Sequence, residues 1–230
     1  MATETIPQVA AIPKVVAEIP QIQPTGAAEG RRGARPLRSR IVHLTPEELL
    51  AVLKTARSRC ARDWAMILLV YRHGLRASEI CDLKLADLDL KAGSLSIRRL
   101  KGSLHTIQPL YRHKGQPLLD EVAALRAWLR VRQSDGSDYL FLSQKGGRLH
   151  RSQFFRIFQA RAEAAGLPAQ KCHPHALKHS LATHLIAGNV NLALVKQCLG
   201  HKTIGSTMKY VAVSDSQATE AAQAALMRLY

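Results

Sequence analysis

Residues 173–185 read HPHALKHSLATHL, and residues 199–210 read LGHKTIGSTMKY. The first segment opens a predicted helix on which Lys178 follows His175 by about one turn. The second segment sets His201 nine residues before Tyr210. From residue 174 onward the pattern predicts helix in four pieces, so these segments decide the fold class of the C-terminal part.

Two further patterns precede them in the chain. GLRASEI, residues 74–80, places Arg76 just after a predicted helix end and Glu79 one turn later. LKGS, residues 100–103, places Lys101 in a tight turn between two predicted strands. Taken singly, an arginine of this kind is usually a surface ion pair and a lysine in a turn is usually solvated. These ordinary explanations do not account for the whole set, because all of the positions occur together in one order and with matching spacing.

Together the four segments resemble the tyrosine recombinase (phage integrase) family across residues 41–230. The resemblance implies a mainly α fold with a small antiparallel β-sheet (α+β), the catalytic-domain fold of that family. It implies an enzyme that cuts and rejoins DNA through a 3′-phosphotyrosyl intermediate, independently of metal, ATP or any cofactor. The family pattern, carried over position by position, gives the catalytic set Arg76, Lys101, His175, Lys178, His201 and Tyr210, with Glu79 in support.

The chemistry of that reaction explains the residue types. A tyrosine oxygen attacking a phosphodiester creates a five-coordinate phosphorus with extra negative charge on its non-bridging oxygens, and cationic donors must stabilise it. Arg76 is the expected main clamp and His201 adds a donor. Lys101 is expected to protonate the leaving 5′ oxygen, and by resemblance His175 is the general base for Tyr210.

Lys178 is the one departure from the family pattern, which has a second arginine there. Lysine keeps the charge but lacks the planar fork that binds two oxygens at once. Losing one well-aimed donor costs about 2.7–4 kcal/mol, of which the retained charge recovers a part. We therefore expect a working but slower enzyme. The alternatives are a catalytically weak or inactive DNA-binding regulator on the same fold, and a monomeric relaxase resembling the type IB topoisomerases.

The catalytic domain is predicted to span residues 41–213, and the regions on either side of it are considered separately. Residues 1–40 are predicted to be a disordered tail, because prolines space them without any helical or alternating period. Residues 214–230 are predicted to form a helix that packs on its own domain or, as the resemblance implies, docks on a neighbouring protomer. The tail ends in an arginine-rich arm that either binds DNA phosphates or is a solvated linker: Arg31, Arg32, Arg35, Arg38 and Arg40.

Within the catalytic domain the pattern predicts alternating helices and two small strand regions. Thr45, Pro46 and Glu48 form a capping-box signature, and Gly74 ends the next, strongly apolar helix. The expected elements are a helix that begins at Pro46 in HLTPEELLAVLKTA (43–56), helices at 63–73, 117–133 and 150–165, a helix and a turn within LRASEICDLKLADLDL (75–90), strands at 94–100 and 104–110, and a short strand in YLFLS at 139–143.

Charge points to the partner. Lys and Arg number 33 against 17 Asp and Glu, a net charge of +16 with a sequence pI near 10.2, which favours a polyanion. Binding to an anionic membrane would call for one long basic amphipathic helix, whereas here the charge is spread along the chain. No signal segment or membrane-spanning run is present, so a cytoplasmic, nucleoid-associated protein is expected.

The expected partners are double-stranded DNA and further copies of the chain, in a tetramer on paired sites. In size the chain resembles catalytic-domain-only recombinases such as fimbrial phase-switch invertases, so a helper DNA-binding protein is a further expected partner.

A metal site is the remaining alternative. His175 and His179 are four residues apart on one helical face, a known ligand spacing. No second cysteine lies near Cys172 and no glutamate adjoins the histidines, so we expect no metal. His173, His179 and His184 are expected to cap, pack or contact phosphate.

Overall fold

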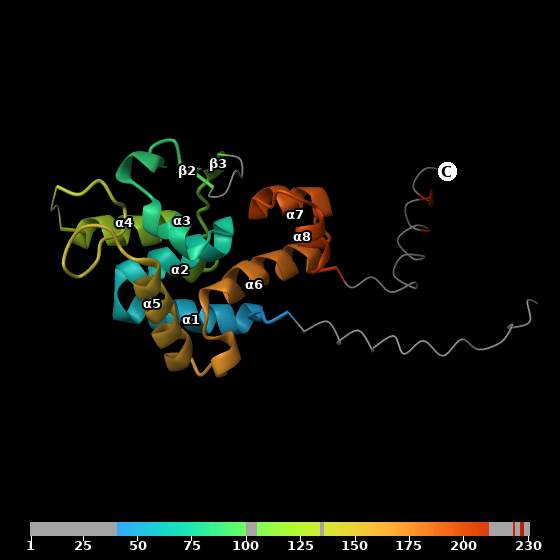
Figure 1. Ribbon diagram of the computed structural model, residues 1–230, viewed down its shortest axis with the longest axis horizontal. Coiled ribbons are helices and arrows are strands. Elements are labelled where there is room, and N and C mark those ends of the chain that lie inside the picture. The colour runs from blue at the N-terminus through green and yellow to red at the C-terminus, as the bar shows by residue number, and fades with distance from the viewer. Residues whose placement is uncertain (1–40, 100–104, 134–135, 212–222, 224–225, 228–230) are drawn as a thin grey trace, which may run out of the picture. The chain divides into compact units, whose positions relative to one another are not determined.

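A computed structural model of the chain (Figure 1) describes residues 41–99, 105–133, 136–211, 223 and 226–227. The chain divides into two units, Met1–Ser39 and Arg40–Tyr230, and all described residues lie in the second. The predicted arginine-rich arm, the turn with Lys101 and nearly all of the terminal helix 214–230 lie outside the described residues.

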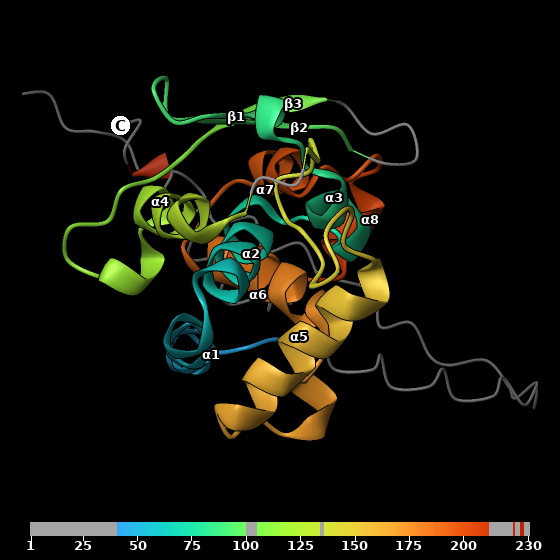
Figure 2. The same ribbon diagram turned by 90° about the vertical axis from the view of Figure 1, so that its left-hand side faces the viewer.

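The described residues form a helical domain with one small sheet, as predicted. In both views the sheet lies on one side of helix α2, with α1 and α5 on the other (Figure 2). The helices are α1 (Pro46–Arg59), α2 (Ala61–His73), α3 (Ala77–Asp82), α4 (Glu121–Val131), α5 (Arg151–Ala164), α6 (Pro174–Ala187), α7 (Leu192–Leu199) and α8 (Gly205–Met208), with short 3-10 helices at Leu85–Asp87, Pro117–Leu119 and Ala169–Lys171.

Helix α2 is the centre of the core. Every side chain from Trp64 to Val70 is buried, which is what its unbroken apolar sequence predicts. It packs against α1, α4, α5 and α6, so the core surrounds it on several faces. Its C-terminal end is therefore held in a fixed place, and the chain that follows that end carries Arg76.

The helix boundaries follow the predicted signals. Thr45 caps α1: its hydroxyl accepts from the Glu48 N–H at 3.2 Å, and the Glu48 carboxylate accepts from the Thr45 N–H at 2.8 Å. Gly74 ends α2 at φ 58°, in the left-handed region that favours glycine. A Cβ atom at Gly74 would approach Leu199 to 3.1 Å and Leu181 to 3.2 Å, so this turn also lets α7 and α6 come close.

The sheet is antiparallel in the order β1 (Leu88–Asp89), β2 (Ser94–Ile97), β3 (Thr106–Pro109). The predicted strand pair is confirmed, with shorter strands, and β1 is an addition that the sequence did not signal. Both strands of the β2–β3 hairpin are attached to the end of α2. Gln108 on β3 bonds the His73 ring at 2.7 Å, and Arg99, just after β2, donates to the His73 carbonyl at 2.8 Å.

Two predicted elements differ. The strand expected in YLFLS is wrong: Tyr139 and Leu142 form only isolated bridges, to Lys84 and Arg148. Leu140 and Phe141 are fully buried, which produced the strand-like pattern. Their backbone groups pair separately, since the Leu140 carbonyl accepts from the Trp128 indole and its N–H donates to Leu83. The helix expected over 117–133 begins instead with a 3-10 turn, and α4 starts after Asp120, which caps it through the Ala123 N–H at 2.7 Å.

The C-terminal helices form a second, smaller apolar cluster. Leu181 and Ala182 of α6 pack there against Val195 and Leu199 of α7. Three of the four predicted helical pieces after residue 174 are thus confirmed. No helix in the described part of the chain is long and apolar enough to cross a membrane. All four cysteines are unpaired: Cys60, Cys81, Cys172 and Cys198.

Ser180, inside the motif on α6, provides a test of this packing. Its buried hydroxyl accepts from the Leu44 N–H at 2.8 Å and donates to the Ala176 carbonyl at 2.7 Å. We expect Ser180→Ala to lower the free energy of unfolding by about 1–3 kcal/mol, because the buried Leu44 N–H loses its acceptor. Urea unfolding measures this, with the exposed Ser58→Ala as a control that should change stability by less than about 0.5 kcal/mol. Equal losses in the two variants would contradict the assignment.

Candidate active site

Arg76 stands at the N-terminus of α3, two residues after the turn at Gly74. Its backbone N–H donates to one Glu79 oxygen at 2.8 Å, and its Nη1 donates to the other at 2.6 Å. Glu79 is buried, and burial alone would raise the pKa of its carboxyl. The hydrogen bonds from Arg76 and the charge of Arg99 outweigh that and hold the pKa of Glu79 below its usual value. Glu79 therefore stays ionised and contacts Arg76 with both oxygens, while the Arg76 side chain remains 32% exposed; the supporting role of Glu79 in catalysis stays a prediction.

Arg99 reaches the other side of the same carboxylate, and sequence reasoning missed it. Its side chain is fully buried, with Nη1 3.3 Å from Glu79 Oε2. A signal did exist: Leu95 and Ile97 are buried on β2, and continuing that alternation places Arg99 on the same inward face. Its neighbour Arg98 is exposed, as the same alternation requires.

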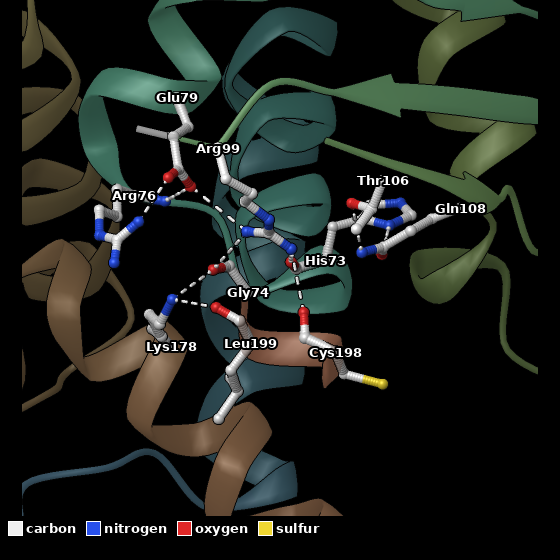
Figure 3. Close-up of polar contacts among 10 residues, drawn as sticks. All are labelled: His73, Gly74, Arg76, Glu79, Arg99, Thr106, Gln108, Lys178, Cys198 and Leu199. Atoms are coloured by element: carbon white, nitrogen blue, oxygen red, sulfur yellow. Dashed lines mark hydrogen bonds and ion pairs between the residues drawn. The ribbon is translucent and has the colours of Figure 1, made fainter. Parts of the chain in front are cut away.

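Arg99 and Lys178 together bind the carbonyl ends of two helices (Figure 3). Arg99 donates to the carbonyls of His73 and Gly74 at the end of α2 and to Cys198 at the end of α7. Lys178 donates to Gly74 at 3.0 Å and to Leu199 at 2.7 Å. Carbonyls in a last helical turn lack intrahelical partners and carry partial negative charge, so they are good acceptors for cations.

Lys178 is consequently a buried cation beside other cations. Its side chain is almost completely enclosed, and burial is the main cause that lowers its pKa to about 7. The charges of Arg99 and Arg76 lower the pKa further, and Glu79 opposes them. Lys178 thus lies next to the predicted phosphate clamp, with its ammonium engaged on backbone carbonyls.

Tyr210 hydrogen-bonds to His179. Its hydroxyl lies 2.6 Å from His179 Nδ1, and the two rings are 5.6 Å apart. Burial lowers the pKa of His179 to about 4, helped by Lys209, and burial raises the pKa of Tyr210 to about 12. Near neutral pH an uncharged His179 with its proton on Nε2 can accept the tyrosine proton at Nδ1.

His201 lies on the other side of Tyr210, with nearly parallel rings 6.5 Å apart. Thr207 fixes its orientation through a 2.9 Å hydrogen bond to Nδ1. Burial lowers the pKa of His201 to about 4, followed by the charges of Lys178, Lys209, Arg76 and Arg99. That dependence places His201 in the same positive field as Arg76.

His175 is more exposed than the other predicted site residues that the structure describes. It lines a cleft of about 620 Å³ between α5 and the start of α6, together with Arg151, Phe155 and Arg156. Its ring is 6.1 Å from that of His179. The structure thus gathers Arg76, Lys178, His201 and Tyr210, puts His179 rather than His175 on the tyrosine hydroxyl, and leaves Lys101 outside the described residues.

The histidine cluster does not form a metal centre in the part of the chain that the structure describes, where no group of three or more His, Cys, Asp or Glu side chains is placed to hold an ion. His184 bonds Tyr71 at 2.9 Å and the Leu44 carbonyl at 2.9 Å, a packing role that was one of those expected. The Cys172 thiol faces the carbonyls of Leu167 and Pro168.

The phage integrase family matches residues 43–217, more than half of the chain. The chain belongs to this family. Type 1 fimbriae regulatory protein FimB of Escherichia coli K12 is 40% identical over 174 residues, which cover 74% of this chain and 83% of FimB. FimE of the same strain is 37% identical over 176 residues, covering 74% of this chain and 85% of FimE. Tyrosine recombinase XerA of Pyrococcus furiosus is 32% identical over 185 residues, covering 79% of this chain and 61% of XerA.

Solved structures of the family have the same fold. A crystal structure of XerA recombinase superposes with a TM-score of 0.65 at 28% identity, covering 78% of this chain and 63% of that one. The XerH site-specific recombinase bound to difH substrate gives 0.65 at 27% identity, covering 79% and 54%. The chain thus spans under two thirds of the length of each of these two recombinase structures. Family and fold together support site-specific DNA recombination as the general activity.

The lowered pKa of Lys178 gives a measurable pH dependence. The unfolded chain binds this proton up to about pH 10.5, whereas the folded protein loses it near pH 7. Between those values the unfolded state holds more protons, so raising the pH favours folding. We expect the free energy of unfolding of the parent, minus that of Lys178→Met, to rise by about 1 kcal/mol per pH unit from about pH 7.5 to about pH 9. Chemical unfolding at each pH tests this, and a flat difference would contradict it.

Proposed function

We propose that this protein is a site-specific DNA recombinase that cuts and rejoins DNA strands through a 3′-phosphotyrosyl intermediate, without metal or ATP. One observation carries the proposal. The Tyr210 hydroxyl is hydrogen-bonded to a neutral histidine within a cluster of cations that one buried carboxylate orients. This is the arrangement needed for a tyrosine to attack a phosphodiester whose developing charge must be stabilised by side chains.

The proposed step begins with attack of Tyr210 Oη on the scissile phosphorus. The O–P bond forms as the bond to the 5′ oxygen breaks, and the tyrosine proton passes to a histidine. The 2.6 Å hydrogen bond between the Tyr210 hydroxyl and His179 supports His179 as the proton acceptor, and His175 is the base implied by the family pattern. Arg76 and His201 stabilise the non-bridging oxygens, and Lys101 protonates the 5′ oxygen. Rejoining reverses the step, because the phosphotyrosyl bond retains the energy of the broken phosphodiester.

Double-stranded DNA is the proposed partner. The net charge of +16 supports a polyanion, and exposed Arg151 and Arg156 line the cleft beside His175, next to the proposed site of chemistry. The protein would act on the nucleoid in the cytoplasm. We assign further phosphate contacts to the N-terminal arm with Arg31, Arg32, Arg35, Arg38 and Arg40.

The active assembly is proposed to be a tetramer on paired DNA sites. Leu194 of α7, Ile204 just before α8 and Met208 of α8 are exposed, and we propose that the segment 214–230 of a neighbouring protomer covers this apolar surface. A helper DNA-binding protein is a further proposed source of affinity for the DNA site.

A non-catalytic DNA-binding regulator on the same fold is the second candidate. The observation that favours it is the engagement of Lys178 on two carbonyls, because the ammonium must leave them to reach a phosphate oxygen. Incubation with a nicked DNA substrate separates the two functions, since only the enzyme traps a covalent protein–DNA complex.

Tyr210→Phe tests the nucleophile. Removing only the hydroxyl should leave DNA binding within about twofold and abolish the covalent complex, because no oxygen remains to attack phosphorus. Tyr71→Phe is the matched control, since Tyr71 also donates or accepts a hydrogen bond with a histidine at 2.9 Å. A covalent complex formed by the Tyr210→Phe variant, resolved by denaturing gel electrophoresis, would show that the assignment is wrong.

Lys178 is tested by two substitutions compared in single-turnover cleavage. Lys178→Arg should cleave at least as fast as the parent, because the longer planar fork adds a second aligned donor. Lys178→Ala removes charge and donor and should slow cleavage on the order of 10²–10³-fold. If Lys178→Ala is as fast as the parent, Lys178 lies outside the catalytic site.

A further inference from the structure

Arg99 is enclosed on all sides and contacts three segments that lead into the proposed site (Figure 3). Its Nη1 donates to Gly74, two residues before Arg76, and to Glu79, which grips Arg76 directly. Its Nη2 donates to His73 at 2.8 Å and to Cys198 at 3.0 Å, three residues before His201.

The chain after α7 is shaped around this guanidinium. Gly200 adopts φ +62°, and a Cβ atom there would lie 2.9 Å from Arg99 Nε. Nε has no hydrogen-bond acceptor among the described residues, so the glycine packs directly on it. The backbone between Cys198 and His201 therefore follows the surface of Arg99, and its course depends on where Arg99 lies.

A purely structural ion pair is a poor explanation for this arrangement. Replacing a buried ion pair by apolar side chains of similar volume is often neutral or stabilising, so burial of a charge is weak support for a stability role. The planar fork instead meets two pairs of acceptors at once, which a lysine or an apolar side chain cannot do. Such a fork fixes the positions of the segments that it joins, and these segments carry Arg76 and His201.

We propose that Arg99 is a positioning residue for phosphate activation: it holds Arg76 through Glu79 and Gly74, and His201 through Cys198 and Gly200. The proposal rests on the proposed recombinase function. Arg99 does not touch the substrate, because its side chain is fully buried. It acts on the two groups that stabilise the non-bridging oxygens, and it also shares the Gly74 carbonyl with Lys178 and so limits where that ammonium can lie.

The test compares single-turnover cleavage of three nicked duplexes. One has an ordinary scissile phosphodiester, one a methylphosphonate in which a charged non-bridging oxygen is replaced by methyl, and one a 5′-bridging phosphorothiolate. A methylphosphonate develops less negative charge and needs less stabilisation from Arg76 and His201. A phosphorothiolate expels a thiolate, which leaves without the proton that an alkoxide requires.

Arg99→Met should slow cleavage of the ordinary substrate about 10²-fold, with DNA affinity within about threefold of the parent. On the methylphosphonate the deficit should shrink below about tenfold, and on the phosphorothiolate it should persist. Arg99→Lys keeps a positive charge beside Glu79 but loses the planar fork. Its cleavage rate on the ordinary substrate should lie between the rates of the parent and of Arg99→Met. Arg98→Met is the matched control. It removes the same charge one position along the chain, from a side chain that is 73% exposed, and this variant should cleave like the parent.

Gly200→Ala gives a second route if Arg99→Met does not fold. The added methyl presses on Arg99 Nε while every charged side chain remains, so it should reproduce the same substrate pattern with a smaller deficit. Equal deficits on all three substrates, or relief by the phosphorothiolate alone, would overturn positioning of the phosphate clamp. Parent-like cleavage by Arg99→Met would overturn it as well. If the parent itself forms no covalent complex on any substrate, the proposed recombinase function fails too, whereas parent cleavage with an unaffected Arg99→Met variant refutes only this inference.

Discussion

The site depends on one buried carboxylate shared by two arginines. Glu79 accepts from Arg76 on the solvent side and from Arg99 on the core side. An isolated buried carboxylate would be costly, and an isolated buried arginine likewise, but the shared pair satisfies both and ties a partly exposed cation to the protein interior. Arg76 is thereby held by a carboxylate that is itself shielded from solvent, which favours the fixed orientation that a group aimed at a transition state requires.

An excess of positive charge remains after that pairing. Arg76, Arg99 and Lys178 surround a single carboxylate, and the same field with burial lowers the pKa of His201 and Lys178. Lys178 and His201 therefore bind their protons less tightly than they would in water. A phosphate brings negative charge to this place and reverses the balance, raising the proton affinity of the nearby groups. On this reasoning, binding of DNA and charging of the site are one coupled event.

The sequence predicted what local signals encode. The capping box at Thr45 and the left-handed turn at Gly74 depend on neighbours in the chain, and both are confirmed, whereas the catalytic roles assigned to the site residues stay predictions. The partner of the Tyr210 hydroxyl was not predictable, because His175 and His179 lie on the same face and only the three-dimensional course of the chain after His201 decides between them. YLFLS misled for the opposite reason: its burial looked like that of a strand, but its backbone groups pair with separate, distant partners.

The placement of Lys178 follows from the meeting of two helix ends. Helices α2 and α7 both end in glycines at positive φ, Gly74 and Gly200, and both direct unpaired carbonyls toward the same spot. Cations bound there stabilise both helix ends, so these carbonyls attract the Lys178 ammonium as well as the Arg99 guanidinium. A lysine ammonium is compact and can be fully surrounded by such carbonyls, whereas an arginine fork extends past them. In the proposed recombinase, lysine in place of the family's second arginine would therefore hold one cation at the helix ends, and the rate of strand cleavage would depend on how readily the phosphate draws it back.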